Sequence, residues 1–545
     1  MKKEDFIWLS KYPRGINFEV DPSQYTSVVE LLDKSVKKYG DEVAFINFGR
    51  SLTFNEVDHH SRNFASYLQS IGLNPGDRIA IQMPNLLQYP IAMFGALRAG
   101  LAVVNTNPLY TPREMEHQFN DSGVKAIVIL ANFASSLEEV LPNTNIQHII
   151  ITKMGDLIGG LKGALVNLIV DKVKKMVPPF NLPNAVNFKD VLRIGGRHPF
   201  NEPDIKNSDI AFLQYTGGTT GVSMGATLTH QNIIANMLQI REWMKPKLKE
   251  LEEVVITALP LYHIFALTVN CLCMLELGSK NILVTNPRDI DGFIKELKKY
   301  PFTFMTGVNT LYNALMLNPK FTEIDFSYLK ISVGGGMALQ TAVVNKWEKL
   351  TGTPLVEGYG LSETAPVLTC NPVDGTAQIG TIGIPVPSTD VKIMDDEGNE
   401  AKMGESGEIC AIGPQVMKGY WNRDPETKNA FHEGGWFRTG DIGFMKEDGY
   451  FKIIDRKKDM ILVSGFNVYP NEIEDVVAEI EGIAEVAAIG VPDEKSSEAV
   501  KLFVVKNKDS VTEEVILEHC RKNLTKYKIP KHIEFRDELP KTNVG

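Results

Sequence analysis

Tyr215-Thr-Gly-Gly-Thr-Thr-Gly-Val-Ser-Met-Gly-Ala-Thr-Leu-Thr-His230 is the stretch that decides the fold. It follows an apolar run at 210–214 that predicts a buried strand, and it precedes residues 231–240, whose apolar positions recur at helical spacing. A glycine-rich loop between a strand and a helix can direct backbone N–H groups and hydroxyls at a phosphate. The spacing does not fit the usual GxxxxGK[ST] nucleotide loop, so the sequence predicts a phosphate-binding loop of another type.

Length and composition describe a soluble protein with more than one domain. The 545 residues exceed what one hydrophobic core usually holds, so we expect at least two domains. Hydrophobic residues make up 43% and charged residues 23%, as in ordinary globular proteins. The net charge of −10 argues against a nucleic-acid partner, because binding phosphates along a strand needs a basic surface.

The five cysteines are odd in number and scattered, which favours reduced thiols in the cytoplasm over a disulfide framework. Cys271 and Cys273 are close enough to suggest a metal pair, but both lie in the apolar run 269–275. Burial in a core is therefore the better interpretation. The N-terminus shows no secretory signal, and no stretch reaches the ~18 apolar residues of a membrane-spanning helix.

Residues 157–177 are apolar and carry four lysines, Lys162, Lys172, Lys174 and Lys175. Such a segment can lie in a membrane interface with its lysines toward anionic headgroups. A surface helix packed on the core explains the pattern equally well. The sequence leaves both alternatives open, a purely cytoplasmic protein or one held peripherally on the inner membrane.

The pattern of predicted elements changes twice along the chain. Helical and strand patterns alternate over 26–130 and over 255–333, which favours two mostly parallel sheets flanked by helices. From about residue 380 to 455, short strands separated by turns predict a small, distorted β-barrel. A smaller α+β pattern follows. We expect an N-terminal domain over 1–455, a hinge at 456–459 and a small, mobile C-terminal domain over 460–545.

Four further motifs follow the loop in a fixed order. They are Gly358-Tyr-Gly-Leu-Ser-Glu-Thr364, Trp436-Phe-Arg-Thr-Gly-Asp441, Asp455-Arg-Lys-Lys-Asp459 and Ser464-Gly-Phe-Asn-Val-Tyr-Pro-Asn-Glu-Ile-Glu474. Each is weak alone, and the charged run would ordinarily be a solvated linker. Together with the loop, usually written YTGGTTGxxKGAxLTH, they resemble the long-chain fatty acid–CoA ligases of the adenylate-forming enzymes over nearly the whole chain. That resemblance implies a ligase that joins a long-chain fatty acid to AMP from ATP and then transfers the acyl group to coenzyme A.

The resemblance also implies roles for individual residues. Thr216 and Glu363 would hold Mg²⁺, a hard ion that prefers oxygen ligands. His263 would border the fatty-acid carboxylate, and Lys458 would be the hinge about which the small domain turns. Gly465 would meet the pantetheine arm of coenzyme A. The remaining nucleotide contacts would come from Tyr215, Gly217, Gly218, Thr219, Thr220 and Gly221 in the loop, from Gly335, Gly336, Tyr359 and Gly360 around adenine, from Thr364 at the α-phosphate, and from Asp441 and Arg456 at the ribose.

Two positions depart from the family pattern. Met224 stands where the family has a lysine expected to neutralise the β- and γ-phosphates. The sequence ends at Gly545, where the family continues with a lysine that bridges the carboxylate and the α-phosphate. These departures favour an engineered, truncated chain or a naturally compromised relative. Because losing one transition-state contact typically costs ~10²–10³ in rate, we expect slow adenylation.

Two alternatives remain at this stage. The chain could make acyl-AMP for a carrier protein instead of coenzyme A. It could also be a non-catalytic protein that binds fatty acid or adenylate, as the missing lysines would allow. Acyl chain length and oligomeric state are left open by the sequence.

Overall fold

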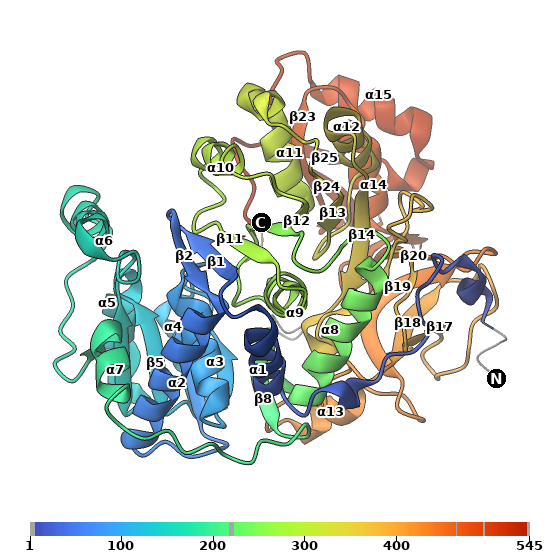
Figure 1. The fold of residues 1–545 in the computed structure, drawn as a ribbon. Coiled ribbons are helices and arrows are strands. Elements are labelled where there is room, and N and C mark those ends of the chain that lie inside the picture. Colours follow the sequence, from blue (N-terminus) through green and yellow to red (C-terminus); the bar gives the residue numbers. More distant parts are fainter. Residues whose placement is uncertain (1–5, 217–222, 465, 494–495, 542–545) are drawn as a thin grey trace.

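Two large sheets form the body of the chain in a computed structural model that describes residues 6–216, 223–464, 466–493 and 496–541 (Figure 1). The first sheet has nine strands in the order β16-β15-β14-β13-β12-β10-β11-β1-β2. Its central pairs, from β14 through to β1, are parallel, and its outer pairs are antiparallel. Its strands are β1 (Val43–Asn47), β2 (Arg50–Thr53), β10 (Val254–Thr257), β11 (Lys280–Leu283), β12 (Phe304–Gly307), β13 (Ile331–Gly334), β14 (Leu355–Gly360), β15 (Val367–Cys370) and β16 (Ile384–Pro385).

The second sheet has seven strands in the order β7-β6-β5-β3-β4-β8-β9, and all its pairs except β8–β9 are parallel. The two mostly parallel sheets expected from the alternating pattern are therefore confirmed. The strands are β3 (Arg78–Gln82), β4 (Ala102–Asn105), β5 (Ala126–Leu130), β6 (His148–Thr152), β7 (Val186–Asn187), β8 (Ile210–Thr216) and β9 (Met224–Thr229).

One local prediction at the loop is wrong. Residues 224–229 form β9, which pairs antiparallel with β8, and helix α8 (His230–Met244) begins only after it. The loop therefore joins the two strands of a hairpin and does not lie at a helix N-terminus. Every residue of β9 after Met224 is buried, so the strand has no alternating pattern. The sequence gives no separate signal for it, because it lies between a glycine-rich run and a strong helical pattern.

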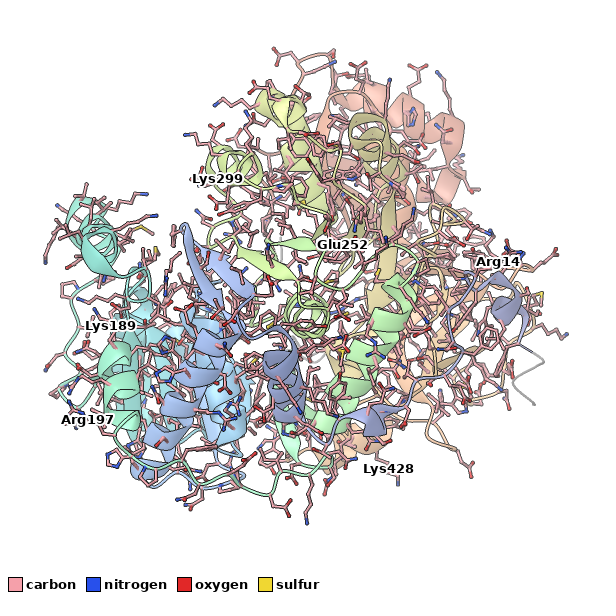
Figure 2. The ribbon with its side chains drawn as sticks, in the orientation of Figure 1. Arg14, Lys189, Arg197, Glu252, Lys299 and Lys428 are labelled. Atoms are coloured by element: carbon pink, nitrogen blue, oxygen red, sulfur yellow. The ribbon has the colours of Figure 1, made fainter. Side chains whose placement is uncertain are left out.

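Helices cover the sheets and begin at clear sequence signals. Thr53 with Glu56 and Thr111 with Glu114 form capping boxes at the starts of α2 and α4. Charged side chains such as Lys189, Arg197 and Lys299 lie on the outside of the molecule (Figure 2). The helices are α1 (Val28–Tyr39), α2 (Phe54–Ser70), α3 (Gln88–Arg98), α4 (Pro112–Ser122), α5 (Ala134–Val140), α6 (Gly160–Leu168), α7 (Phe188–Gly195), α8, α9 (Met274–Glu276), α10 (Ile290–Leu297), α11 (Asn309–Leu317), α12 (Thr341–Thr351), α13 (Asp424–Asn429), α14 (Pro470–Ala478) and α15 (Glu513–Asn523).

The segment predicted as a distorted barrel forms a four-stranded antiparallel sheet, with strand order β17-β18-β19-β20. Its outer strand β20 meets the segment before β16 through an isolated bridge between Gly383 and Phe451. In the described residues the strand pairing is thus open and continues toward the nine-stranded sheet, without closing on itself as a barrel would. The strands are β17 (Asp390–Met394), β18 (Gly407–Ile412), β19 (Phe437–Met445) and β20 (Phe451–Arg456).

The C-terminal part has a sheet and a hydrophobic core of its own. The core includes Ile461, Val500, Leu502 and Cys520, and it is separate from the cores of the large sheets. In Figure 1 this part lies beside α11 and α12, and Asn313 Nδ2 on α11 donates to the Ala484 carbonyl at 3.0 Å. The strands are β21 (Ile461–Val463), β22 (Phe466–Val468), β23 (Ile483–Asp493), β24 (Ser497–Lys506) and β25 (His532–Phe535). The hinge at 456–459 remains a prediction.

Candidate active site

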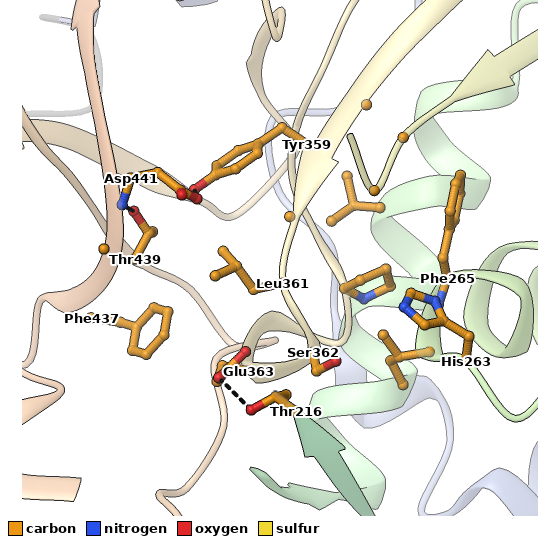
Figure 3. Close-up of a pocket in the computed structure, with 18 of the residues that line it drawn as sticks. Thr216, His263, Phe265, Tyr359, Leu361, Ser362, Glu363, Phe437, Thr439 and Asp441 are labelled. Carbon is orange, nitrogen blue, oxygen red and sulfur yellow. Dashed lines mark hydrogen bonds between the residues drawn. The ribbon is translucent and has the colours of Figure 1, made fainter. Parts of the chain in front are cut away.

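A cavity of about 830 Å³ lies where the ends of the two large sheets meet the four-stranded sheet. Figure 3 shows Asp441 and Tyr359 on one side, His263 and Phe265 on the other, and Glu363 with Thr216 between them. The cavity thus brings together residues that are far apart in the sequence. The predicted site residues that line it are Tyr215, Thr216, His263, Gly335, Gly336, Tyr359, Gly360, Glu363, Asp441, Arg456 and Lys458.

Glu363 and Thr216 meet at the centre of this cavity. Glu363 lies in a short 3₁₀ turn after β14 and is only 7% exposed. Its Oε1 accepts hydrogen bonds from Thr216 Oγ1 at 3.4 Å and from the Tyr420 hydroxyl at 2.9 Å. Burial raises the pKa of the Glu363 carboxyl, although both hydrogen bonds oppose that shift. A cation beside this carboxylate would offset the cost of burying its charge.

Asp441 is the second buried carboxylate of the cavity. Its Oδ2 accepts from the Tyr359 hydroxyl at 2.6 Å, and Arg456 Nε lies 3.3 Å from its Oδ1. Burial raises the pKa of Asp441, while the Arg456 charge and the Tyr359 hydroxyl lower it. An ionised carboxylate has about four acceptor positions, so two of them remain for other hydroxyls.

His263 lies at the far side of the cavity, just before the π-helical segment η7 (Ala266–Cys273). Burial lowers the pKa of His263 to about 4, so the ring is neutral near pH 7. The Phe265 N–H donates to its Nδ1 at 3.3 Å, which places the single ring proton on Nε2. His263 can therefore donate one hydrogen bond to a neighbouring group but cannot neutralise its charge.

Three of the predicted glycines lie where the backbone packs too closely, or turns too sharply, for a side chain. A Cβ at Gly335 would lie 2.8 Å from the Gly358 carbonyl oxygen, and one at Gly360 would lie 1.9 Å from the Pro366 carbonyl oxygen. Gly336 has a φ of +81°, in the left-handed region that glycine adopts readily. At these positions a side chain would displace the cavity wall itself.

The base of the glycine-rich loop is closed by hydrogen bonds. Ser223 Oγ donates to the Thr216 carbonyl at 2.6 Å, and His117 Nε2 lies 2.8 Å from the Ser223 carbonyl oxygen. Tyr215 donates to Asp121 Oδ2 at 2.7 Å. Met224 lines the cavity beside Thr216, its partner across the hairpin. The predicted contacts at Gly217, Gly218, Thr219, Thr220, Gly221 and Gly465 lie outside the described residues.

Thr364 does not lie where the resemblance placed it. It is fully buried and is not among the residues that line the cavity. Its hydroxyl donates to the Pro366 carbonyl oxygen within the turn that carries Glu363. Its side chain therefore stabilises that turn, and contact with an α-phosphate is not supported by this geometry. Lys458, in contrast, is exposed and lines the cavity.

Several lining residues were missed from the sequence. Tyr420, which holds Glu363, comes from a turn without a recognisable signal. An apolar wall formed by Ile240, Trp243 and Met244 of α8 faces the cavity with Val269 of η7. Its i, i+3, i+4 spacing was visible, but that spacing also describes ordinary core packing. Cys271 and Cys273, also in η7, are buried free thiols, as expected.

Comparison with known proteins agrees with this geometry. A family model described as AMP-binding enzyme matches residues 32–421, and one described as AMP-binding enzyme C-terminal domain matches residues 472–545. The chain belongs to the AMP-binding enzyme family. The resemblance drawn from the motifs is thereby confirmed.

Two relatives of this family match the chain along nearly its whole length. The chain is 55% identical to the long-chain-fatty-acid–CoA ligase of Salmonella typhimurium, with 100% of this chain and 97% of the relative covered. It is 39% identical to the protein of the same name from Bacillus subtilis, with 99% and 96% covered.

Solved structures of the family share the fold. ATP-bound MatB from Rhodopseudomonas palustris superposes with a TM-score of 0.79 at 28% identity, over 95% of this chain and 96% of that one. An anthranilate CoA ligase, AuaEII, in complex with anthranoyl-AMP gives 0.85 at 23% identity, over 96% and 97%. The second likeness concerns the fold alone.

Proposed function

We propose that this chain is an ATP-dependent long-chain fatty acid–CoA ligase. In the first step a carboxylate oxygen of the fatty acid attacks the α-phosphorus of ATP, acyl-AMP forms and pyrophosphate leaves. In the second step the thiol sulfur of coenzyme A loses its proton and attacks the acyl carbonyl, and AMP leaves. The observation that carries the proposal is one cavity that joins buried carboxylates and hydroxyls to an apolar wall.

The nucleotide would lie at the side of the cavity with Asp441 and Tyr359. Asp441 is a buried acceptor with free positions, which suits the two hydroxyls of a ribose. Arg456 lies beside the same carboxylate and can reach the same sugar. The backbone at Gly335 and Gly336 would lie against the base, and the Tyr359 ring would stack on it.

Thr216 and Glu363 fit a magnesium ion. Both present oxygen atoms, and the Glu363 carboxyl is buried with a raised pKa, so a cation there would favour its ionised form. In the described residues no group of three or more His, Cys, Asp or Glu side chains could hold a metal. Two protein oxygens completed by substrate phosphates and water are a usual set for Mg²⁺. When bound, the ion would neutralise charge that develops on the phosphates.

The fatty acid would lie at the side of His263 and the apolar wall. The Nε2–H of neutral His263 can donate to a carboxylate oxygen and orient it, while Ile240, Trp243 and Val269 remove the alkyl chain from water. Lys458 would be the hinge of the C-terminal domain, and Gly465 would meet the pantetheine arm in the second step.

The experiment supplies ATP, Mg²⁺ and a long-chain fatty acid, with and without coenzyme A. Pyrophosphate release and an acyl-CoA product support the proposal. Pyrophosphate with stable acyl-AMP, and no thioester when coenzyme A is added, would support a ligase that serves a carrier protein. Ligand binding without thioester, even from supplied acyl-AMP, would support a non-catalytic binding protein.

Met224 carries a second part of the proposal, that adenylation is slow. It lines the cavity beside Thr216, at the position where the family motif has a lysine. A thioether is uncharged and cannot compensate the phosphates. Binding of ATP and fatty acid would be retained while the first chemical step is slowed.

A peripheral contact with an anionic lipid surface is the third part of the proposal. Helix α6 continues into the π-helical turn η6 (Ile169–Val173) and lies at an outer edge of the molecule (Figure 1). This segment exposes large apolar side chains to an unusual degree: Leu161 is 91% exposed, Val173 71%, Leu165 55% and Leu168 53%. Exposed Lys174 and Lys175 add positive charge to an otherwise acidic chain. No helix in the described residues could span a membrane.

Vesicle flotation tests this contact. We expect the chain to float with anionic vesicles, and a double substitution of Leu161 and Val173 to serine to abolish flotation. Leu109→Ser is the control, because Leu109 is 59% exposed and lies outside this segment of the sequence. Equal flotation of both variants would contradict the assignment of this segment.

A further inference from the structure

We propose that Trp243 of α8 closes the acyl-binding part of the cavity and sets the longest fatty acid that fits. The inference rests on the proposed function and deepens it, because it assigns the chain-length limit to one side chain. Trp243 would touch the methyl end of the longest accepted acid and so act as a specificity-determining residue.

Apolar side chains form the wall that leads to Trp243. Ile240, Trp243 and Met244 lie on one face of α8, at i, i+3 and i+4. Val269 of η7 and Cys370 of β15 line the same cavity. The π-helical segment that carries Val269 begins at Ala266, shortly after His263, so this wall starts close to the place where the carboxylate end of the substrate would be held.

The indole of Trp243 is fixed in its place. It is 1% exposed, and its Nε1–H donates to the Asn371 carbonyl at 3.1 Å. Its ring lies edge-on to the ring of Tyr12, with centroids 5.1 Å apart and planes at 88°. The Tyr12 hydroxyl in turn donates to the Pro385 carbonyl at 2.6 Å. Rotation of this indole would break its hydrogen bond and its aromatic contact. We therefore expect the indole to keep its position and this end of the cavity to stay closed.

Trp243 also separates the cavity from the surface. Tyr12 contacts the indole but is not among the residues that line the cavity, so the indole lies between the two. Behind Tyr12 lies Phe18, with ring centroids 5.2 Å apart, and Phe18 is 49% exposed. A smaller side chain at 243 would therefore extend the apolar cavity toward the N-terminal segment.

The decisive variant is Trp243→Phe, measured on a homologous series of saturated fatty acids. We expect the preferred chain length of this variant to be longer than that of the wild type. The shift should appear both in the dissociation constants measured by calorimetry and in the rates of ATP–pyrophosphate exchange. Each additional buried methylene should improve binding about fourfold, which corresponds to ~0.8 kcal/mol. Trp347→Phe is the matched control: Trp347 is fully buried and donates to Ser332 Oγ at 3.1 Å, but it does not line the cavity.

An unchanged chain-length profile in folded Trp243→Phe would overturn the inference. Should that variant not fold, Ile240→Phe decides the question, because it fills the same wall without removing the indole. Its optimum should move to shorter acids, and no movement would again overturn the inference. The two proposals can fail independently. If the wild type exchanged pyrophosphate with none of the acids, the proposed function would be wrong, but the chain-length dependence of binding measured by calorimetry would still test the role of Trp243.

Discussion

Met224→Lys is the substitution that most directly tests the site. Met224 is the first residue of β9 and pairs with Thr216 across the hairpin, so the two side chains lie on the same face of the sheet. Thr216 Oγ1 is 3.4 Å from Glu363, the proposed metal ligand. A lysine at 224 would therefore bring an ammonium to the edge of the proposed phosphate site.

The size of the effect follows from Coulomb's law. A unit charge about 6 Å from a phosphate charge, at an effective dielectric constant of about 20, contributes ~2.8 kcal/mol. If that contribution is made mainly in the transition state, the rate rises about 10²-fold. Loss of a comparable electrostatic contact in other enzymes costs ~10²–10³. We expect Met224→Lys to raise the rate of pyrophosphate release by about this factor.

The assay is ATP–pyrophosphate exchange with a saturating fatty acid, which reports the first step alone. Met224→Gln is the control, because it has a similar length and no charge, and its rate should stay near that of the wild type. Equal gains in the lysine and glutamine variants would show that packing and not charge limits the rate. No gain in either would refute the proposal that this position slows adenylation.

Three further outcomes are expected. Glu363→Gln should slow exchange about 10²-fold and raise the Mg²⁺ concentration needed for half-maximal rate; an unchanged Mg²⁺ requirement would exclude Glu363 as a ligand. Asp441→Asn should raise KM for ATP about tenfold or more with KM for fatty acid unchanged, since hydrogen bonds to a charged group contribute ~1.5–3 kcal/mol. Burial raises the pKa of Glu357 from 4.5 to about 8, so its contribution to stability is full below pH 4.5 and is lost as pH rises toward 8. At pH 8 the free energy of unfolding of Glu357→Gln, measured with urea, should therefore exceed that of the wild type by roughly 1–3 kcal/mol, whereas at pH 4.5 the two values should be similar. A difference that does not change with pH would contradict this prediction.

The sequence predicted the architecture well where one pattern dominated. β5 coincides with the uninterrupted apolar run 126–130, as is typical of a strand that is buried on both faces. β9 was missed because it is short, starts beside glycines and runs directly into α8. Antiparallel pairing with β8 is a long-range feature that local propensity does not contain.

The site was predictable at its motifs and not between them. Motif residues such as Thr216, Glu363 and Asp441 converge on one cavity although they are far apart in sequence. Thr364 belongs to the same motif as Glu363, but its hydroxyl bonds to the turn and its side chain stays out of the cavity. Adjacent residues in a turn point in different directions, so membership of a motif does not place each side chain. The apolar wall could not be predicted for a related reason: in the sequence, an apolar residue that lines a cavity has the same helical spacing as one that fills a core.

The positive charges of the cavity suggest why position 224 matters so much. Four lysines and arginines line the described part of the cavity: Arg456, Lys457 and Lys458 lie in the predicted hinge, and Arg438 lies on β19. Arg438 pairs with Glu408 at 3.0 Å, Arg456 lies by Asp441, and Lys457 pairs with Asp396. The positive side chains near the phosphates of ATP would therefore be either paired with carboxylates or carried by the hinge as it moves. A lysine at 224 would lie on β9, the edge strand of the seven-stranded sheet, and would keep its charge in place while the small domain turns. On this reasoning Met224→Lys should increase adenylation more than thioester formation from supplied acyl-AMP, and equal gains in both steps would show that the added charge acts on binding in general.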